Sequence, residues 1–252
     1  MDKTFAGKRV VVIGGNSGIG LASAQAFAQS GAEVAIVGRS AQTLEAARVA
    51  IGGNTLALQA DISRVADIER IADQLREQWG RVDVLFANAG IGAFLPLEAV
   101  DEETWDLIHN TNLKGTFFTV KKLLPLMQRG ASIVLCGSVG GIRNVPGALV
   151  YGASKAGVHH MGHTLAGELA GRGIRVNTLI PGPIDTPLPG RSLGVPAQAV
   201  AQVQEQLSNE SPMKRMGTPQ EAAAAVLFLA SPAASFITGT EIIVDGGIHG
   251  TK

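Results

Sequence analysis

Two side chains one helical turn apart have the chemistry needed to transfer a proton. Tyr151 and Lys155 lie in an Ala/Gly-rich stretch that predicts a helix reaching about Gly171. Residues i and i+4 share one face of a helix, so the phenol and the ammonium can address one point in a cleft. A phenol has a pKa of about 10 and is a poor acid–base group at neutral pH, but a neighbouring cation favours its ionised form. Because Tyr151 is the only tyrosine, any tyrosine-dependent chemistry must use it.

A serine lies close before this pair. Ser138 precedes Tyr151 by thirteen residues and follows an apolar run that ends at Leu135 and Cys136. The carboxyl ends of strands are where open α/β sheets bind ligands. A serine at that position could donate a hydrogen bond to a substrate carbonyl.

A glycine-rich turn predicts a nucleotide site near the N-terminus. Gly14, Gly18 and Gly20 follow the first apolar run and open the first helical stretch, with the spacing GxxxGxG. Glycines there allow a tight turn and let a pyrophosphate approach the amides at a helix N-terminus. A glycine-rich turn without a ligand is the alternative, since such turns are common in α/β folds.

The end of the second apolar run indicates which dinucleotide would bind. A carboxylate there would accept hydrogen bonds from the ribose 2′-hydroxyl and favour NAD, but the run ends in Gly38, Arg39 and Ser40. Gly38 leaves room, and Arg39 could pair with a 2′-phosphate. We therefore expect NADP(H) to be preferred over NAD(H). A solvated surface arginine is the alternative.

The surrounding elements alternate regularly between apolar runs and Ala-rich helical stretches. Runs that are apolar throughout indicate strands buried on both faces, and strand–helix alternation predicts an α/β, doubly wound, mostly parallel sheet with helices on both faces. No linker interrupts the pattern, so residues 1–252 are predicted to form one domain. Residues 181–217 are proline-rich and too long for an ordinary connection, which indicates a lid or a mobile insert with a short helix over 197–207. The seven predicted strands cover residues 9–13, 34–37, 55–58, 82–86, 133–135, 174–176 and 241–244.

Composition excludes several classes of function. The 21 basic and 21 acidic residues cancel, so the chain lacks the basic surface of a nucleic-acid binder and the polybasic segments of a lipid binder. Cys136 is the only cysteine, which excludes an intrachain disulfide and a cysteine-based zinc site. No signal peptide or membrane span is apparent, and we expect a cytoplasmic location.

Taken together, these motifs resemble those of the short-chain dehydrogenase/reductase family. The resemblance runs from about Lys8 to Gly247 and depends on the order and separation of the motifs. Two features depart from the family pattern: Ile13 stands where a threonine commonly precedes the first glycine, and the segment after Thr186 is long. The motifs are GxxxGxG, Asn88-Ala89-Gly90, Asn112, Ser138, Tyr-x-x-x-Lys, Pro181-Gly182 and the ending Asp245-Gly246-Gly247.

The resemblance implies a seven-stranded Rossmann-like sheet, a homodimer or homotetramer, and a role for each residue. Tyr151 would be the general acid or base for a carbonyl and its alcohol, with Lys155 favouring its ionised form and binding the nicotinamide ribose. Ser138 would hold the substrate oxygen, and Asn112 would support a water relay behind Lys155. Asp61 would contact adenine. The other implied cofactor contacts are Gly14, Asn16, Ser17, Gly18, Ile19, Gly20, Arg39, Ser40, Ile62, Asn88, Ala89, Gly90, Pro181, Gly182, Ile184 and Thr186.

Several other residues have simpler interpretations. His159 and His163 have helical i, i+4 spacing, but without a neighbouring carboxylate motif we expect interface or surface histidines and no metal site. Cys136 is expected to be a small buried apolar residue, and Trp79 and Trp105 to be packing residues on helices. Two arginines, Arg129 and Arg172, form either a basic patch at the mouth of the site, as a carrier-protein reductase would require, or solvated helix ends.

Three functions are compatible with these features. The favoured one is a reductase or dehydrogenase acting on a small-molecule carbonyl or alcohol, with a 3-oxoacyl-carrier-protein reductase as one specific case. A sensor that binds NADP(H) without turnover is a rival, since fold does not imply function. A sugar-nucleotide epimerase or dehydratase fits less well, because little sequence remains after Gly217 for an added substrate domain.

Overall fold

The structure is a computed structural model, of which we describe residues 3–250. Within these residues a single seven-stranded sheet has the order β3-β2-β1-β4-β5-β6-β7, and every neighbouring pair is parallel. The predicted doubly wound parallel sheet is confirmed. The strands are β1 (Arg9–Ile13), β2 (Glu33–Gly38), β3 (Leu56–Gln59), β4 (Val82–Ala87), β5 (Met127–Cys136), β6 (Arg175–Pro181) and β7 (Glu241–Val244).

The strands are apolar throughout because both faces of the sheet are covered. On β1, Val10 and Val12 pack into the core on one face, while Val11 and Ile13 pack into the core on the other. All four are at most 1% exposed. Side chains alternate between the faces of a strand, so a strand buried on both sides has no polar positions to show in its sequence.

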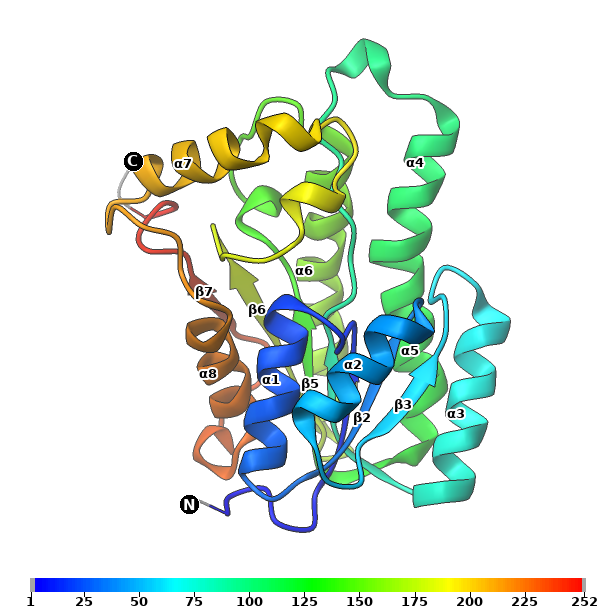
Figure 1. The fold of residues 1–252 in the computed structure, drawn as a ribbon. Coiled ribbons are helices and arrows are strands. Elements are labelled where there is room, and N and C mark those ends of the chain that lie inside the picture. Colours follow the sequence, from blue (N-terminus) through cyan, green and yellow to red (C-terminus); the bar gives the residue numbers. More distant parts are fainter. Residues whose placement is uncertain (1–2, 251–252) are drawn as a thin grey trace.

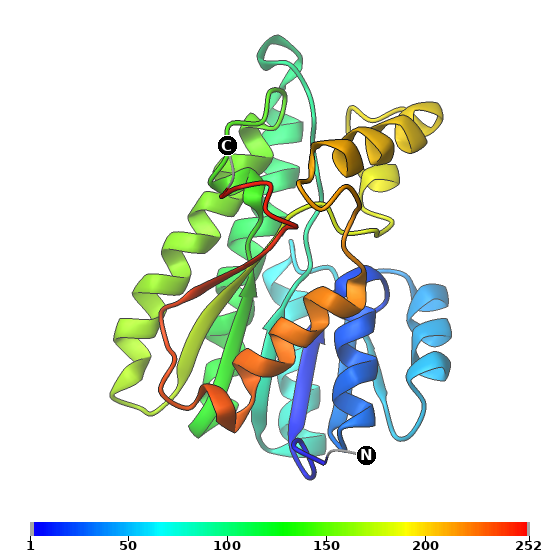
Figure 2. The same ribbon diagram turned by 90° about the vertical axis from the view of Figure 1, so that its left-hand side faces the viewer.

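Two helical layers provide this cover (Figures 1 and 2). The first contains α1, α2 and α8, and the second contains α3, α5 and α6, with α4 packed on α6. The structure contains no helix, among residues 3–250, that is long and apolar enough to cross a membrane. The helices are α1 (Gly18–Gln29), α2 (Ala41–Ile51), α3 (Val65–Trp79), α4 (Glu102–His109), α5 (Gly115–Leu123), α6 (Leu149–Ala170), α7 (Val200–Glu210) and α8 (Pro219–Ala230).

The strand order reverses at β1, because β2 lies on one side of it and β4 on the other. In open α/β sheets a crevice forms at such a point, outside the carboxyl ends of the strands. The glycine-rich turn after β1 and the Asn88-Ala89-Gly90 loop after β4 therefore meet at the same edge. This edge is where the sequence motifs are expected to converge.

The proline-rich segment 181–217 crosses above this edge. It contains short 3-10 turns at Pro189–Arg191 and Ala197–Ala199, followed by α7, so the predicted helix begins as a 3-10 turn and continues as an α-helix. The segment pairs with the loop after β4: the amide of Phe94 donates to the carbonyl of Leu193 at 2.9 Å, and the amide of Leu193 donates to the carbonyl of Gly92 at 3.0 Å. In Figure 2, α7 (gold) lies above the carboxyl ends of the strands, outside both helical layers.

Candidate active site

A cleft of about 470 Å³ opens at the carboxyl edge of the sheet. Its walls come from the turn after β1, the end of β2, the loops after β3, β4 and β5, the start of α6 and the 181–217 segment. Most residues expected to contact a dinucleotide lie on these walls. They are Gly14, Asn16, Ser17, Gly18, Ile19, Arg39, Ser40, Asp61, Ile62, Asn88, Ala89, Gly90, Tyr151, Lys155, Pro181 and Thr186.

The glycine-rich turn is shaped by backbone contacts that leave no room for side chains. Gly14 has φ +73°, and a Cβ on it would lie 3.1 Å from the amide nitrogen of Ala89. A Cβ on Gly20 would overlap the carbonyl oxygen of Gly14. The side-chain amide of Asn88 donates to that same carbonyl at 3.2 Å. Gly20 therefore packs against the backbone of the turn and is not among the residues that line the cleft.

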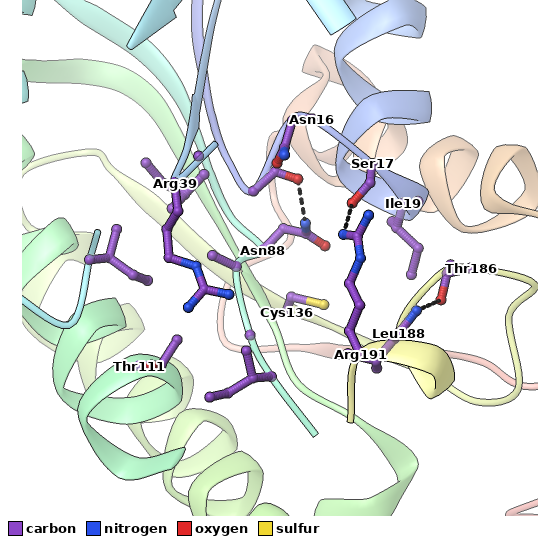
Figure 3. A pocket seen from close by; sticks show the side chains of 18 of the residues that line it. Asn16, Ser17, Ile19, Arg39, Asn88, Thr111, Cys136, Thr186, Leu188 and Arg191 are labelled. Carbon is purple, nitrogen blue, oxygen red and sulfur yellow. Dashed lines mark hydrogen bonds between the residues drawn. The ribbon is translucent and has the colours of Figure 1, made fainter. Parts of the chain in front are cut away.

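The first helix presents its amino end to the cleft. Ser17 is the N-cap of α1, but its side chain caps no amide of the helix. Instead Ser17 Oγ accepts a hydrogen bond from Arg191 Nη1 at 3.1 Å, as Figure 3 shows. Arg191 comes from the 181–217 segment, so this bond joins that segment to the turn where a helix dipole favours an anion.

Arg39 lies in another part of the same cleft. Its side chain is drawn among the lining residues in Figure 3, and the residue is exposed. Nearby, Asn16 Nδ2 donates to Thr43 Oγ1 at 2.7 Å, and a Cβ on Gly38 would lie 2.8 Å from Asn16 Oδ1. Among the lining residues of the described chain, Asp61 is the only carboxylate. With only one carboxylate among its lining residues, the cleft can accommodate an anionic group beside Arg39.

Tyr151 and Lys155 reach the cleft together from the first turns of α6. Both residues are buried, with exposures of 8% and 4%. Lys155 Nζ donates to the carbonyl of Cys136 at 2.9 Å and lies 5.9 Å from the centroid of the Tyr151 ring. A Cβ on Gly90 would lie 3.1 Å from Lys155 Nζ, so a side chain at this point of the loop after β4 would crowd the ammonium.

Asn112 lies behind this pair and does not line the cleft. It belongs to a π-helical turn, Asn110–Lys114, between α4 and α5, and such turns are frequent at functional sites. Its Oδ1 accepts from the amide of Ile91 at 2.9 Å, and its Nδ2 donates to the carbonyl of Ile91 at 2.9 Å and to Ser154 Oγ at 3.0 Å. Ser154 Oγ in turn donates to the carbonyl of Tyr151 at 2.7 Å. Asn112 thus links the β4 loop to the start of α6.

Ser138 follows β5 and faces Tyr151 across a small gap. Ser138 Oγ accepts from the amide of Gly140 at 3.1 Å. A Cβ on Gly140 would lie 3.5 Å from Ser138 Oγ and 3.2 Å from Cε1 of Tyr151. The hydroxyl and the phenol ring therefore border one point, although Ser138 itself is not among the residues that line the 470 Å³ cleft.

The buried groups of this region include one of the histidines that were expected at an interface or at the surface. His159 is 6% exposed, and its Nε2 accepts a hydrogen bond from the amide of Ser138 at 3.1 Å. Burial lowers the pKa of His159, which outweighs the opposing effect of Glu241. By contrast, His160 and His163 are exposed, as expected. In residues 3–250 no group of three potential ligands is placed to hold a metal ion.

Cys136 lies at the end of β5 with an exposure of 7%. Burial raises the pKa of its thiol, against a smaller opposite effect of the Lys155 ammonium. A raised pKa disfavours the thiolate, which is the reactive form of cysteine. Cys136 is therefore a buried, protonated residue, as expected, and it also forms part of the cleft wall.

Two further residues that were expected to contact the cofactor do not line the cleft. Gly182 donates its amide to the carbonyl of Val244 at 2.9 Å, and a Cβ on it would lie 2.5 Å from the Cβ of Asp245. Ile184 is 6% exposed and bridges to Gly217. Neither residue lines the cleft, because β7 and the end of the 181–217 segment pack on them.

Of the two interpretations of Arg129 and Arg172, the structure disagrees with a basic patch at the mouth of the site. Arg129 lies near the amino end of β5 and donates to the carbonyl of Gly171 beyond the end of α6. Arg172 donates to the carbonyl of Leu124. Because β5 runs toward the cleft and α6 runs away from it, both arginines lie at the opposite edge of the sheet.

The two tryptophans behave differently. Trp79 is 9% exposed and packs in the core, as expected, whereas Trp105 is 46% exposed and stacks on His109 with ring centroids 4.1 Å apart. Trp105 therefore packs within its own helix and not in the core. Helical spacing showed that Trp105 belongs to a helix but not which face of α4 is covered.

Several lining residues have no counterpart among the sequence predictions. The most informative is Arg191, which reaches the glycine-rich turn from 174 residues away in the chain. Nothing in its local sequence distinguishes it from other surface arginines, because its position depends on the pairing of Leu193 with Phe94. The other unpredicted lining residues include Thr43, Thr111, Ile91, Pro187 and Leu188.

Comparisons with known proteins agree with this geometry. A family model described as enoyl-(acyl carrier protein) reductase matches residues 13–249. The chain is 40% identical over 247 residues to the 3-oxoacyl-[acyl-carrier-protein] reductase of Thermotoga maritima, covering 96% of this chain and 98% of that protein. It is 41% identical over 244 residues to the oxidoreductase asL5 of Sarocladium schorii, covering 96% of each.

Solved structures give the same result. The crystal structure of levodione reductase superposes with a TM-score of 0.93 at 33% identity, covering 98% of this chain and all of that one. The chain belongs to the short-chain dehydrogenase/reductase family. It is an oxidoreductase of that family, which acts on alcohol and carbonyl groups and uses NAD(P)(H).

Proposed function

We propose that this protein interconverts a carbonyl and a secondary alcohol with NADP(H), using Tyr151 as the general acid or base. The observation that carries the proposal is the convergence of a buried Tyr151, a buried Lys155 and the Ser138 hydroxyl beside one cleft. A proton donor must lie within hydrogen-bond reach of the atom that it serves. The only tyrosine of the chain lines the cleft, which supports its assignment as that donor.

The cleft fits a nicotinamide dinucleotide. Gly14 and Gly18 have φ +73° and +53°, and side chains at Gly14 and Gly90 would press on the Ala89 backbone and the Lys155 ammonium. These glycines leave a cradle at the amino end of α1, where amides and the helix dipole favour phosphates. The walls named above would hold the dinucleotide, and Lys155 would hold the ribose next to the nicotinamide. When bound, the nicotinamide supplies or accepts the hydride.

The side chains of the chain would handle the proton. During reduction Tyr151 donates its hydroxyl proton to the carbonyl oxygen, and during oxidation its phenolate accepts the alcohol proton. The Lys155 ammonium stabilises the phenolate by charge attraction, which is strong where water is excluded. Ser138 Oγ already accepts from the amide of Gly140, so its own hydrogen is available for the substrate oxygen. Asn112 fixes the backbone on which Tyr151 is mounted.

The preference for NADP(H) is supported by the end of β2. Arg39 and Ser40 line the cleft where a carboxylate would select the 2′-hydroxyl of NAD, and the exposed Arg39 is not paired with any carboxylate of the described residues. Arginine is suited to a phosphate because its guanidinium donates two parallel hydrogen bonds.

The substrate class is a small carbonyl compound, and a 3-oxoacyl thioester is the first candidate. Its support is the 40% identity with the 3-oxoacyl-[acyl-carrier-protein] reductase of Thermotoga maritima. Relatives named for other substrates match at 34% and 37% identity, namely the levodione reductase of Leifsonia aquatica and the glucose 1-dehydrogenase of Gluconobacter oxydans. With Arg129 and Arg172 at the far edge of the sheet, docking of a carrier protein would require other basic residues.

The proposal is tested by a panel of 3-oxoacyl thioesters, ketones, aldehydes and sugars with each cofactor, run on the wild type and Tyr151→Phe. Tyr151→Phe should bind NADPH as the wild type does but lose about 10²- to 10⁴-fold in kcat. Substantial turnover by Tyr151→Phe would disprove the assigned proton donor. Tight NADPH binding without turnover of any substrate would instead favour a cofactor sensor.

A further inference from the structure

One face of α6 carries a third buried polar residue behind the pair at the cleft. Tyr151, Lys155 and His159 follow one another at intervals of four residues, so they form a row along the helix. All three are buried. Lys155 and His159 both bond the backbone that leaves β5: Lys155 Nζ donates to the carbonyl of Cys136 at 2.9 Å, and His159 Nε2 accepts from the amide of Ser138 at 3.1 Å.

Two glycines in the loop that follows β5 leave space for the imidazole ring of His159. Gly137 separates the two anchored residues, and a Cβ on it would overlap His159 Nε2. A Cβ on Gly141 would lie 3.1 Å from Cε1 of His159. The ring therefore fills the space between α6 and the 137–141 loop, and larger residues at either glycine would displace it.

The bond fixes the protonation state of the ring. A neutral imidazole has one N–H and one acceptor nitrogen. Because Nε2 accepts from the Ser138 amide, Nδ1 carries the hydrogen and faces Glu241 Oε1 of β7 at 3.7 Å. The charged or titratable groups of the described chain that act on His159 are Glu241, Lys155 and His163. Burial has the largest effect and lowers the pKa of His159, Lys155 and His163 act in the same direction, and Glu241 opposes them.

We propose that His159 is a positioning residue that holds Ser138 toward the substrate oxygen through the hydrogen bond between the Ser138 amide and its neutral imidazole. This inference rests on the proposed function of Ser138 and Tyr151. Protonation of His159 would turn Nε2 from an acceptor into a donor facing another donor. The bond would then be lost, and Ser138 would no longer be fixed beside Tyr151. The active form of the enzyme thus requires an uncharged His159.

The test compares His159→Gln and His159→Leu in the direction of carbonyl reduction. In this direction Tyr151 must be protonated, so its own titration cannot reduce kcat at low pH. Because burial lowers the pKa of His159, the wild-type kcat should fall only when the pH is clearly below about 6.5, the ordinary histidine value. The amide oxygen of His159→Gln can accept the same bond without titrating, so kcat should be kept near neutral pH and the fall at low pH should disappear.

His159→Leu removes the acceptor and should lower kcat by about 10- to 100-fold at every pH, with a smaller change in KM. If His159 acts through Ser138, the same substitution in a Ser138→Ala background should lower kcat by less than about threefold. The inference would be overturned if His159→Leu kept the wild-type kcat, or if it lowered kcat equally in the wild-type and Ser138→Ala backgrounds. It would also be overturned if the kcat of His159→Gln fell at low pH as that of the wild type does. Should His159→Leu fail to fold, the pH profile of His159→Gln decides alone.

Tyr151→Phe, assayed in parallel, separates this inference from the proposed function. Activity that survives in Tyr151→Phe would refute the proposed function. Loss of activity in Tyr151→Phe together with normal kcat and pH dependence in the His159 variants would refute only the role of His159.

Discussion

Arg39→Asp should reverse the cofactor preference, because the substitution replaces an attractive charge with a repulsive one beside the 2′-phosphate. A phosphate monoester carries about −1.5 to −2 charges at neutral pH. Arg39 is exposed, so a high effective dielectric applies, and one pair of unit charges at about 4 Å is worth about 1 kcal/mol. Loss of Arg39 alone, in Arg39→Gln, should therefore weaken NADPH binding by about tenfold.

The aspartate adds repulsion of about 1 kcal/mol, since its shorter side chain lies farther from the phosphate. Together the two effects come to about 2.4 kcal/mol, which corresponds to roughly 60-fold weaker binding of NADPH. NADH has no 2′-phosphate, and the new carboxylate can accept a hydrogen bond from its 2′-hydroxyl. The Kd of NADH should therefore change by less than about threefold.

Calorimetric titration of both cofactors with the wild type, Arg39→Gln and Arg39→Asp measures this difference directly. The effect on NADPH should shrink at about 1 M salt, where the Debye length falls to about 3 Å. Equal weakening of NADPH and NADH by Arg39→Asp would refute the assignment. So would a loss of NADPH binding that does not depend on salt, because a surface charge pair must be screened.

Three further substitutions test the hydrogen bonds of Asn112, the shape of the glycine-rich turn and the ion pair between Glu221 and Arg215. Asn112→Ala removes three hydrogen bonds worth about 1 kcal/mol each, so the melting temperature should fall by about 6–12 °C; a fall below about 2 °C would contradict this. Gly20→Ala should abolish NADPH binding because its Cβ would overlap the turn's own backbone, whereas Gly167→Ala, with no atom within 4 Å, should leave binding unchanged. Hydrogen bonding to Arg215 lowers the pKa of Glu221 to about 2, so its contribution to stability is present above the ordinary value of 4.5 and lost as the pH falls toward about 2. The difference in melting temperature between wild type and Glu221→Gln should accordingly narrow with acidification, and a constant difference would be evidence against that linkage.

The sequence predicts the regular parts of this fold because local patterns determine them. The apolar runs locate the strands, but the predicted fifth strand at 133–135 is shorter than β5, which begins at Met127. Residues 128–130 are exposed, and the pairing of β4 with β5 shifts between Val82 and Val84. A pattern based on burial therefore detects only the covered half of this strand.

The sequence predicts less well the features that depend on which parts of the chain meet. Arg191 reaches Ser17 only because the 181–217 segment pairs with the loop after β4. The misplacement of Arg129 and Arg172 has a different cause: their charge is visible in the sequence, but their distance from the site depends on the directions of β5 and α6. His159 was open to prediction, since the i, i+4 rule that joins Tyr151 to Lys155 also makes His159 the next member of the row.

The proposed proton-transfer groups and the wall of the substrate side come from different parts of the chain, which explains why the reaction can be assigned more closely than the substrate. The proposed proton-transfer groups are buried on α6, after β5 and on the π-helical turn, and Asn112, Ser138 and Lys155 form hydrogen bonds with backbone. Such positions constrain residue type strongly, because an unpaired buried polar group costs about 1–3 kcal/mol. The cleft is bordered on the other side by Pro187, Leu188 and the exposed Arg191 of the 181–217 segment. Substitutions at exposed positions cost little stability, so changes at Pro187 and Arg191 should alter KM and substrate choice before they alter the proton transfer.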